Sequence, residues 1–157
     1  MTVEHPFNKI VEGIGVSDIR QFDAEVSSIP GIIKLTLGEP NFDTPEHIKE
    51  AAIQAIKDNH SHYTPNSGIP ELRQAAAEYY NKKFNFNYTG DQVITTIGAT
   101  EGIAASLQAI LNPGDTVIVP TPVFPLYLPI TLVNQGNFIT VDTSNDGFVL
   151  TADKLRE

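Results

Sequence analysis

The stretch Gln92–Gly102, QVITTIGATEG, decides the fold class of this 157-residue chain. Its first six residues are rich in β-branched side chains, which is typical of a strand, and the small residues Gly98, Ala99 and Thr100 follow at once. Apolar side chains at helical spacing come next, at Ile103, Leu107, Ile110 and Leu111. The pattern predicts a strand over 92–97 that passes through a tight turn into a helix.

The same alternation continues toward the C-terminus. Asn112–Asp115 (NPGD) ends the helix, Thr116–Val119 has the composition of a buried strand, and Asn137–Val141 is a third strand candidate. A short helix around Leu132 separates the last two strands. A strand-helix-strand-helix-strand order implies right-handed crossovers and mostly parallel pairing. We therefore predict an α/β fold with a mostly parallel sheet and flanking helices.

The residues before this region predict two helices, one short strand and one capped helix start. Ser17–Ser27 has apolar side chains at helical spacing, and Ile32–Leu37 resembles a strand. Thr44 precedes Pro45 and an acidic residue, which predicts a helix capped by the threonine hydroxyl. A further helix is expected to begin near Pro70.

Composition narrows the function classes. The formal charge of −9 argues against nucleic acid or an anionic membrane as the main partner. The chain has no cysteine, which excludes disulfides, a thiolate nucleophile and a thiolate zinc site. Met1–Ile10 lacks a signal-peptide core, and no apolar run is long enough for a membrane span. We expect a cytoplasmic protein.

The last seven residues look like the opening of a helix. Thr151 could cap it, but the chain stops after about one turn, which is too short for a stable helix. We therefore expect this sequence to be the first part of a longer protein.

The junction at Gly98 carries the clearest chemical signal. Free N–H groups at a helix start favour an anion, Gly98 and Ala99 leave room for it, and the Thr100 hydroxyl could donate another hydrogen bond. The alternative is that Gly98 only lets the chain turn and Thr100 only caps the helix. The phosphate patterns G-x-x-x-x-G-K-[ST] and G-x-G-x-x-G are both absent, which favours a ligand with a single phosphate.

Two other segments offer ligand contacts. Phe124 lies in the proline-rich loop 120–127, where its ring could stack on a flat heteroaromatic ligand or serve as a core anchor together with Tyr127. His60 and His62 lack the helical spacing of metal ligands, so we predict a solvated loop and no metal site. The phenol of the adjacent Tyr63 could donate to a phosphate. The spacing indicates no catalytic residue.

Several motifs, in order, resemble the class I/II aminotransferases of the aspartate aminotransferase fold, which are fold type I pyridoxal-phosphate enzymes. They are Leu35–Pro45 (LTLGEPNFDTP), His62–Pro65 (HYTP), Gly68–Arg73 (GIPELR), Ile97–Thr100 (IGAT) and Leu111–Asp115 (LNPGD). The segments Pro122–Tyr127 and Ile139–Thr151 look most like the aromatic or N-acetyl-diaminopimelate branch.

The resemblance implies a role for each matching residue. Gly98, Ala99 and Thr100 would hold the phosphate of pyridoxal 5'-phosphate, and Phe124 would stack on its pyridine ring. Tyr63 would reach the cofactor phosphate of the neighbouring subunit in a homodimer, and Gly38 would lie beside the substrate's α-carboxylate. The segment around Ile14 to Ile19 would border the substrate pocket and the dimer contact. Residues 1–45 would form an N-terminal arm and small-domain segment, and 46–157 the first part of the large cofactor domain.

The resemblance also implies what this chain lacks. In the family, the lysine that bonds to the cofactor and the other catalytic groups come later in the chain, so we expect these 157 residues alone to be inactive. The family's sheet inserts later strands between Val93–Ile97 and the other two strands. The whole protein would move an amino group between an amino acid and a 2-oxo acid. The alternatives are a carbon–sulfur β-lyase on the same scaffold and a non-catalytic anion-binding module.

Overall fold

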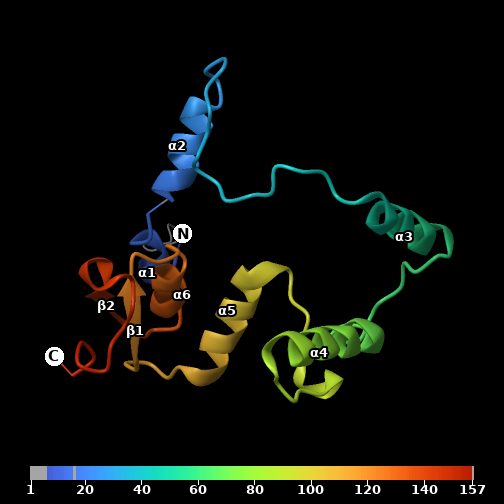
Figure 1. The fold of residues 1–157 in the computed structure, drawn as a ribbon. Helices are drawn as coiled ribbons and strands as arrows, with labels where there is room; N and C mark the ends of the chain where they lie inside the picture. Colours follow the sequence, from blue (N-terminus) through green and yellow to red (C-terminus); the bar gives the residue numbers. More distant parts are fainter. Residues whose placement is uncertain (1–6, 16, 157) are drawn as a thin grey trace, which may run out of the picture. The chain divides into compact units, whose positions relative to one another are not determined.

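A computed structural model describes residues 7–15 and 17–156, which Figure 1 traces from blue to red. The chain forms two compact units, one made of the residues up to Phe22 and from Ile97 onward, the other of Asp23–Thr96. The predicted division at residue 45 stays a prediction. The helices are α1 (Lys9–Glu12), α2 (Asp18–Val26), α3 (Glu46–Lys57), α4 (Pro70–Phe84), α5 (Gly98–Ile110) and α6 (Tyr127–Val133), with 3-10 turns η1 (Gly90–Gln92) and η2 (Ser144–Asp146).

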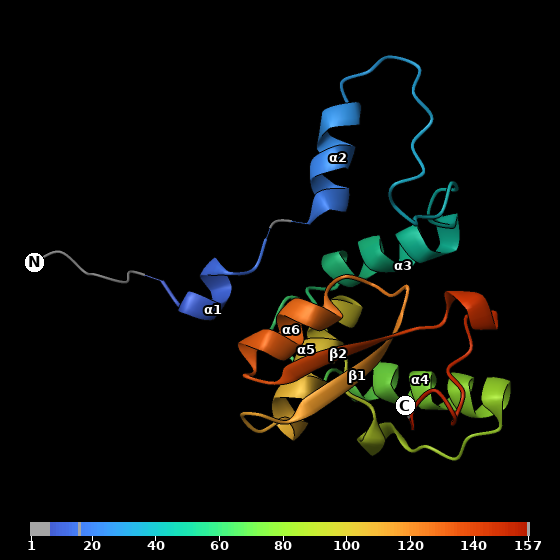
Figure 2. The ribbon, with the colours of Figure 1, turned by 90° about the vertical axis from the view of Figure 1, so that its left-hand side faces the viewer.

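The first unit contains a parallel two-stranded sheet, as the alternation of strands and helices predicts. Strand β1 (Thr116–Thr121) pairs with β2 (Asn137–Asp142) from Thr116 opposite Asn137 to Thr121 opposite Asp142. Helix α6 connects the strands and contacts both β2 and α5, and Figure 2 shows it beside the two strands. Val119 and Ile130 are buried. The predicted α/β class is confirmed in this unit.

Two buried threonines satisfy their hydroxyls within the backbone of this unit. Thr131 Oγ1 donates to the carbonyl of Tyr127 at 2.8 Å, and Thr143 Oγ1 donates to that of Thr121 at 2.9 Å. Because a buried hydroxyl without a partner would cost about 1–3 kcal/mol, these bonds explain how polar side chains lie in the small core.

The predicted strand over 92–97 is wrong for the described residues. Gln92 ends the turn η1, and the residues from Val93 to Thr96 are extended without pairing to any strand that the structure describes. Side chains and a loop hold them instead, because Arg73 Nε donates to the carbonyl of Val93 at 2.8 Å and Thr95 N donates to that of Ser67 at 3.0 Å. A strand needs a ladder partner, and no described segment supplies one.

The predicted strand over Ile32–Leu37 is wrong for the same reason. These residues form no ladder, and side-chain contacts fix them instead. Lys34 Nζ lies 3.2 Å from a carboxylate oxygen of Asp23, and Thr36 donates a hydrogen bond to the same carboxylate.

Helix boundaries follow the sequence closely, with one capping error. Pro70 is the first residue of α4, as expected, and the short helix around Leu132 appears as α6. Helix α3 begins at Glu46 with Pro45 as its N-cap and has no side-chain cap. Thr44 therefore lies one residue outside the capping position, too far from the amides it was expected to satisfy. The terminal residues from Ala152 to Arg156 form turns, with Thr151 Oγ1 accepting from Lys154 N at 3.3 Å.

The turn after α5 depends on an aspartate. The backbone N–H of Asn112 donates to Asp115 Oδ2 at 2.7 Å, and the Asn112 side chain donates to the same oxygen at 3.2 Å. These bonds favour the ionised carboxylate, so they lower the pKa of Asp115 below its ordinary value. This carboxylate fixes the entry into β1.

A pH-dependent stability contribution follows from Asp115. Because its pKa is lower in the folded than in the unfolded chain, the contribution is present above the unfolded pKa and is lost as pH falls through the folded pKa. We expect Asp115→Asn to lower the melting temperature at pH 7, and we expect this difference to shrink as the pH falls through the acid range. A melting-temperature difference that does not change with pH would contradict this.

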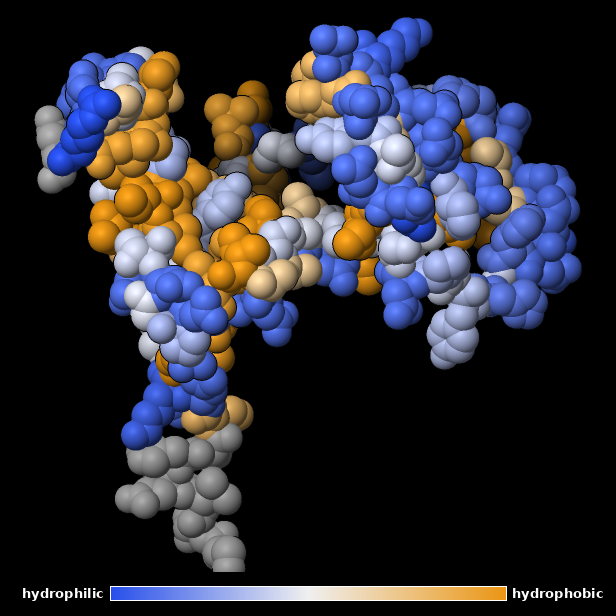
Figure 3. Space-filling model, turned by 90° about the horizontal axis from the view of Figure 1, so that it is seen from below, coloured by the Kyte–Doolittle hydropathy of each residue, from blue (hydrophilic) through white to orange (hydrophobic). Residues whose placement is uncertain are grey.

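Much apolar surface is exposed. Figure 3 shows many hydrophobic side chains, in orange, on the face that it presents. Leu35 and Ile97 each expose more than nine-tenths of their surface, at 92% and 91%. Apolar surface on this scale is more than a monomeric soluble protein usually exposes. No helix in the described ranges combines the length and the hydropathy that crossing a membrane requires.

Candidate functional site

The start of α5 is the candidate anion site. Gly98 is its first helical residue and has a φ of +76°, a conformation that favours glycine. Ala99 and Thr100 follow in the first turn, where backbone N–H groups have no intrahelical acceptor. No side chain caps this helix in the usual way, so Thr100 does not serve as the N-cap. Thirteen aligned peptide units add their dipole at this end.

The local structure fits a bound phosphate. All three residues are exposed, and a Cβ built on Gly98 would meet no atom within 4 Å, which leaves open space beside the amides. The Glu101 carboxylate accepts a hydrogen bond from the N–H of Ile97, so the helix start already holds one anionic group. A phosphate dianion on the Ala99 and Thr100 amides would be stabilised in the same way, by the preference of a helix N-terminus for negative charge.

Phe124 lies in the loop that follows β1, in the same unit. Phe124 is 54% exposed, so it is not the buried anchor of the alternative interpretation, whereas Tyr127 is half-buried at the start of α6. Figures 1 and 2 both place this loop and the start of α5 at one end of the unit. An exposed aromatic residue and the candidate anion site therefore share one end of the parallel sheet, and open parallel sheets bind ligands at the carboxyl ends of their strands.

The other two predicted site residues belong to the second unit. Tyr63 is fully exposed in the polar loop before α4, and Gly38 is exposed in the irregular segment before α3. The structure brings together Gly98, Ala99, Thr100 and Phe124 within one unit, and it fixes no distance from them to Tyr63 or Gly38.

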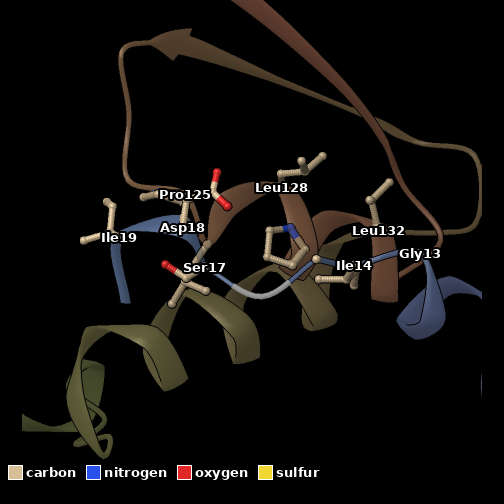
Figure 4. A pocket seen from close by; sticks show the side chains of 11 residues that line it. Gly13, Ile14, Ser17, Asp18, Ile19, Pro125, Leu128 and Leu132 are labelled. Carbon is tan, nitrogen blue, oxygen red and sulfur yellow. The ribbon is translucent and has the colours of Figure 1, made fainter. Parts of the chain in front are cut away.

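A cavity of about 450 Å³ lies beside α6, within the first unit. Figure 4 shows Ile14 and Ser17 on one side of it and Leu128 and Leu132 of α6 on the other. The sequence interpretation placed Ile14 to Ile19 at a substrate pocket, and Val16 of that stretch lies outside the described residues. The two leucines were missed, although their i, i+4 spacing is the signal of one helix face.

Comparisons with known proteins agree on one family. The family described as aminotransferase class I and II matches residues 30–157. The "Probable N-acetyl-LL-diaminopimelate aminotransferase" of Bacillus subtilis is 44% identical over 99% of this chain and 40% of its own length. Aromatic-amino-acid aminotransferase 2 of Thermococcus litoralis is 37% identical over 94% of this chain and 38% of its own length.

A solved structure supports the same grouping. Aspartate aminotransferase from Thermus thermophilus with maleate superimposes with a TM-score of 0.90 at 34% identity, covering 97% of this chain and 41% of that one. The chain thus spans about 40% of the length of these relatives.

Proposed function

The chain belongs to the class I and II aminotransferases, and from that premise we propose that it is the N-terminal part of a pyridoxal-phosphate enzyme. The whole protein would transfer an amino group between an amino acid and a 2-oxo acid. The observation that carries the proposal is the start of α5, where open space adjoins backbone amides that favour a phosphate. A homodimer and a cytoplasmic location belong to the same proposal.

Each candidate residue has a binding role and none has a bond-making role. The Ala99 and Thr100 amides hold the cofactor phosphate, and the Thr100 hydroxyl donates to it. Phe124 stacks on the pyridine ring and excludes water from that face. Gly38 leaves room for the substrate α-carboxylate, and Tyr63 donates to the phosphate in a neighbouring subunit. The bound cofactor supplies the electron sink that stabilises a carbanion at the substrate α-carbon.

Catalysis needs groups that these 157 residues do not provide. We propose that the lysine that bonds to the cofactor lies outside them, in the part of the protein that corresponds to the remaining three-fifths of the relatives. The large exposed apolar surface supports this proposal, because the rest of the protein or a second subunit would cover it.

Product analysis of the intact protein tests the proposal. With pyridoxal 5'-phosphate, an amino acid donor and 2-oxoglutarate, transfer predicts one glutamate for each donor consumed. Pyruvate and ammonia in place of glutamate would indicate the carbon–sulfur β-lyase instead. An intact protein that retains cofactor but converts no donor would favour the non-catalytic anion-binding module, and one that retains no cofactor would overturn both enzyme assignments.

Phe124 gives a prediction about the ring contact. Replacing it with leucine removes an exposed aromatic face, and we expect the dissociation constant for pyridoxal 5'-phosphate to rise about tenfold. Phe124→Tyr preserves the ring and should stay within about twofold. Binding is measured by the fluorescence of the cofactor at equilibrium. Equal affinity in the leucine variant would remove Phe124 from the site.

A further inference from the structure

The loop that carries Phe124 is held by hydrogen bonds on both sides of that residue. On the C-terminal side, the N–H of Tyr127 at the start of α6 donates to the carbonyl of Phe124 at 3.4 Å. On the N-terminal side, the carbonyl of Thr121 at the end of β1 accepts two bonds from Thr143. The backbone N–H of Thr143 donates at 3.0 Å, and its side-chain hydroxyl donates at 2.9 Å. Phe124 therefore lies between two anchored carbonyls.

The hydroxyl of Thr143 adds to what the sheet already provides. Thr143 follows the last residue of β2, so its backbone bond to Thr121 continues the parallel ladder by one step, and any residue with an N–H would make it. The hydroxyl bond needs a serine or threonine at this position. Thr143 is itself held, because it is only 2% exposed and its carbonyl accepts from the N–H groups of Asp146 and Phe148, both at 3.0 Å.

We propose that Thr143 is a positioning residue for cofactor binding, because its buried hydroxyl holds the start of the loop 121–126 in the conformation that presents Phe124 to the pyridine ring. The inference rests on the proposed function, since it needs Phe124 to stack on the cofactor. Thr143 acts through the loop and not through contact with the cofactor. With the loop already held in the free protein, the cofactor does not have to order it on binding.

Removing the hydroxyl lowers the fraction of the protein whose loop is ready to bind. One hydrogen bond of this kind changes an equilibrium between two conformations by about fivefold. The apparent dissociation constant rises in inverse proportion to the fraction that is competent to bind. Loss of the Thr143 hydroxyl should therefore weaken cofactor binding by about threefold to fivefold.

The test compares two variants of the intact protein freed of cofactor. Thr143→Val removes the hydroxyl at nearly constant size, and Thr143→Ser keeps the hydroxyl but loses a buried methyl group. We expect the dissociation constant for pyridoxal 5'-phosphate to rise about threefold to fivefold in the valine variant and to stay within about twofold in the serine variant. Both variants should melt at a lower temperature than the wild type. A role in stability alone would leave the affinity of both variants unchanged.

If Thr143→Val does not fold, Thr143→Ala beside Thr143→Ser makes the same comparison, because these two variants differ only in the hydroxyl. Thr131→Val is the matched control for the loss of a buried hydroxyl. The Thr131 hydroxyl donates to the carbonyl of Tyr127 within α6 and not to the strand end that precedes the loop, so this variant should bind the cofactor within about twofold of the wild type.

A double-mutant cycle locates the effect at the ring of Phe124. In a Phe124→Leu background, Thr143→Val should change the dissociation constant by less than about twofold, because the ring that it positions is gone. Inorganic phosphate, which has no ring, should bind the wild type and Thr143→Val equally.

Equal affinity of the valine and serine variants for pyridoxal 5'-phosphate, or a loss that persists in the Phe124→Leu background, would overturn the inference and leave the proposed function intact. If Phe124→Leu alone binds like the wild type, Phe124 leaves the site and the inference is wrong with it. A wild type that does not bind pyridoxal 5'-phosphate would overturn both the inference and the proposed function.

Discussion

Replacing Gly68 with alanine is expected to destabilise the protein by about 3 kcal/mol, the largest stability effect that the structure predicts for one methyl group. Gly68 is buried with a φ of +97°, where an L side chain is strained. A Cβ built there would lie 1.9 Å from Thr95 Oγ1, far inside the closest contact that real atoms make. The loop must therefore move away from Thr95, which breaks the 3.0 Å bond from Thr95 N to Ser67 O.

Urea denaturation with a double-mutant cycle measures this effect. In a Thr95→Ala background the oxygen at 1.9 Å is gone and the tight contact with the residue's Cβ at 3.0 Å remains, so Gly68→Ala should cost mainly the backbone strain of about 1–2 kcal/mol. Gly38→Ala is the matched control, because a Cβ there meets nothing within 4 Å, and we expect a change below about 1 kcal/mol. An equal cost for Gly68→Ala in both backgrounds would show that Thr95 does not set the limit.

Replacing Ala99 with proline is expected to weaken binding of pyridoxal 5'-phosphate by about 10- to 100-fold. Proline removes the backbone donor and is tolerated in the first turn of a helix, so the change deletes one N–H with little effect on α5. A hydrogen bond to a charged group contributes about 1.5–3 kcal/mol, which corresponds to roughly 10- to 100-fold in affinity. Equilibrium titration of the intact protein with pyridoxal 5'-phosphate measures the dissociation constant.

The control for Ala99→Pro keeps the donor. Ala99→Ser adds one oxygen and retains the N–H, so its affinity should stay within about threefold of the wild type. The affinity for pyridoxal without its phosphate should be the same in all three proteins. If Ala99→Pro keeps the wild-type melting temperature and binds the cofactor normally, the amide at this position is not part of the phosphate site.

Local sequence patterns correctly predicted elements whose backbone hydrogen bonds form within one segment, such as helices, or between strands that are consecutive in the chain. Helix α4 begins at Pro70 because proline suits the first helical turn, and β1 and β2 pair because the helix between them is short. The strand predicted over 92–97 was wrong because composition indicates a β-strand but not its partner, and no described segment pairs with these residues.

The sequence could predict only that part of the candidate site that consists of backbone groups, namely the start of a helix. Gly98, Ala99 and Thr100 became candidates because a strand-like run followed by small residues predicts a helix start, and the structure has that start at Gly98. The hydrogen bond from Ile97 N–H to Glu101 was not predicted. Whether a glutamate side chain folds back toward the start of its helix depends on its rotamer, which the sequence does not determine. Gly38 was chosen from resemblance alone and Tyr63 from resemblance together with its phenol, and both lie in segments without regular structure.

The extended residues from Val93 to Thr96 have a consequence for how the protein assembles. Arg73, whose side chain is only 14% exposed, and the Ser67 carbonyl hold this segment in place, although no strand of the described residues lies against it. Ordering the backbone of one residue costs about 1–2 kcal/mol of conformational entropy. Contacts with residues fewer than thirty positions away already offset this cost for the segment. Any strand that pairs with this segment would thus add to a backbone that is already ordered, without having to order both sides of the new ladder at once.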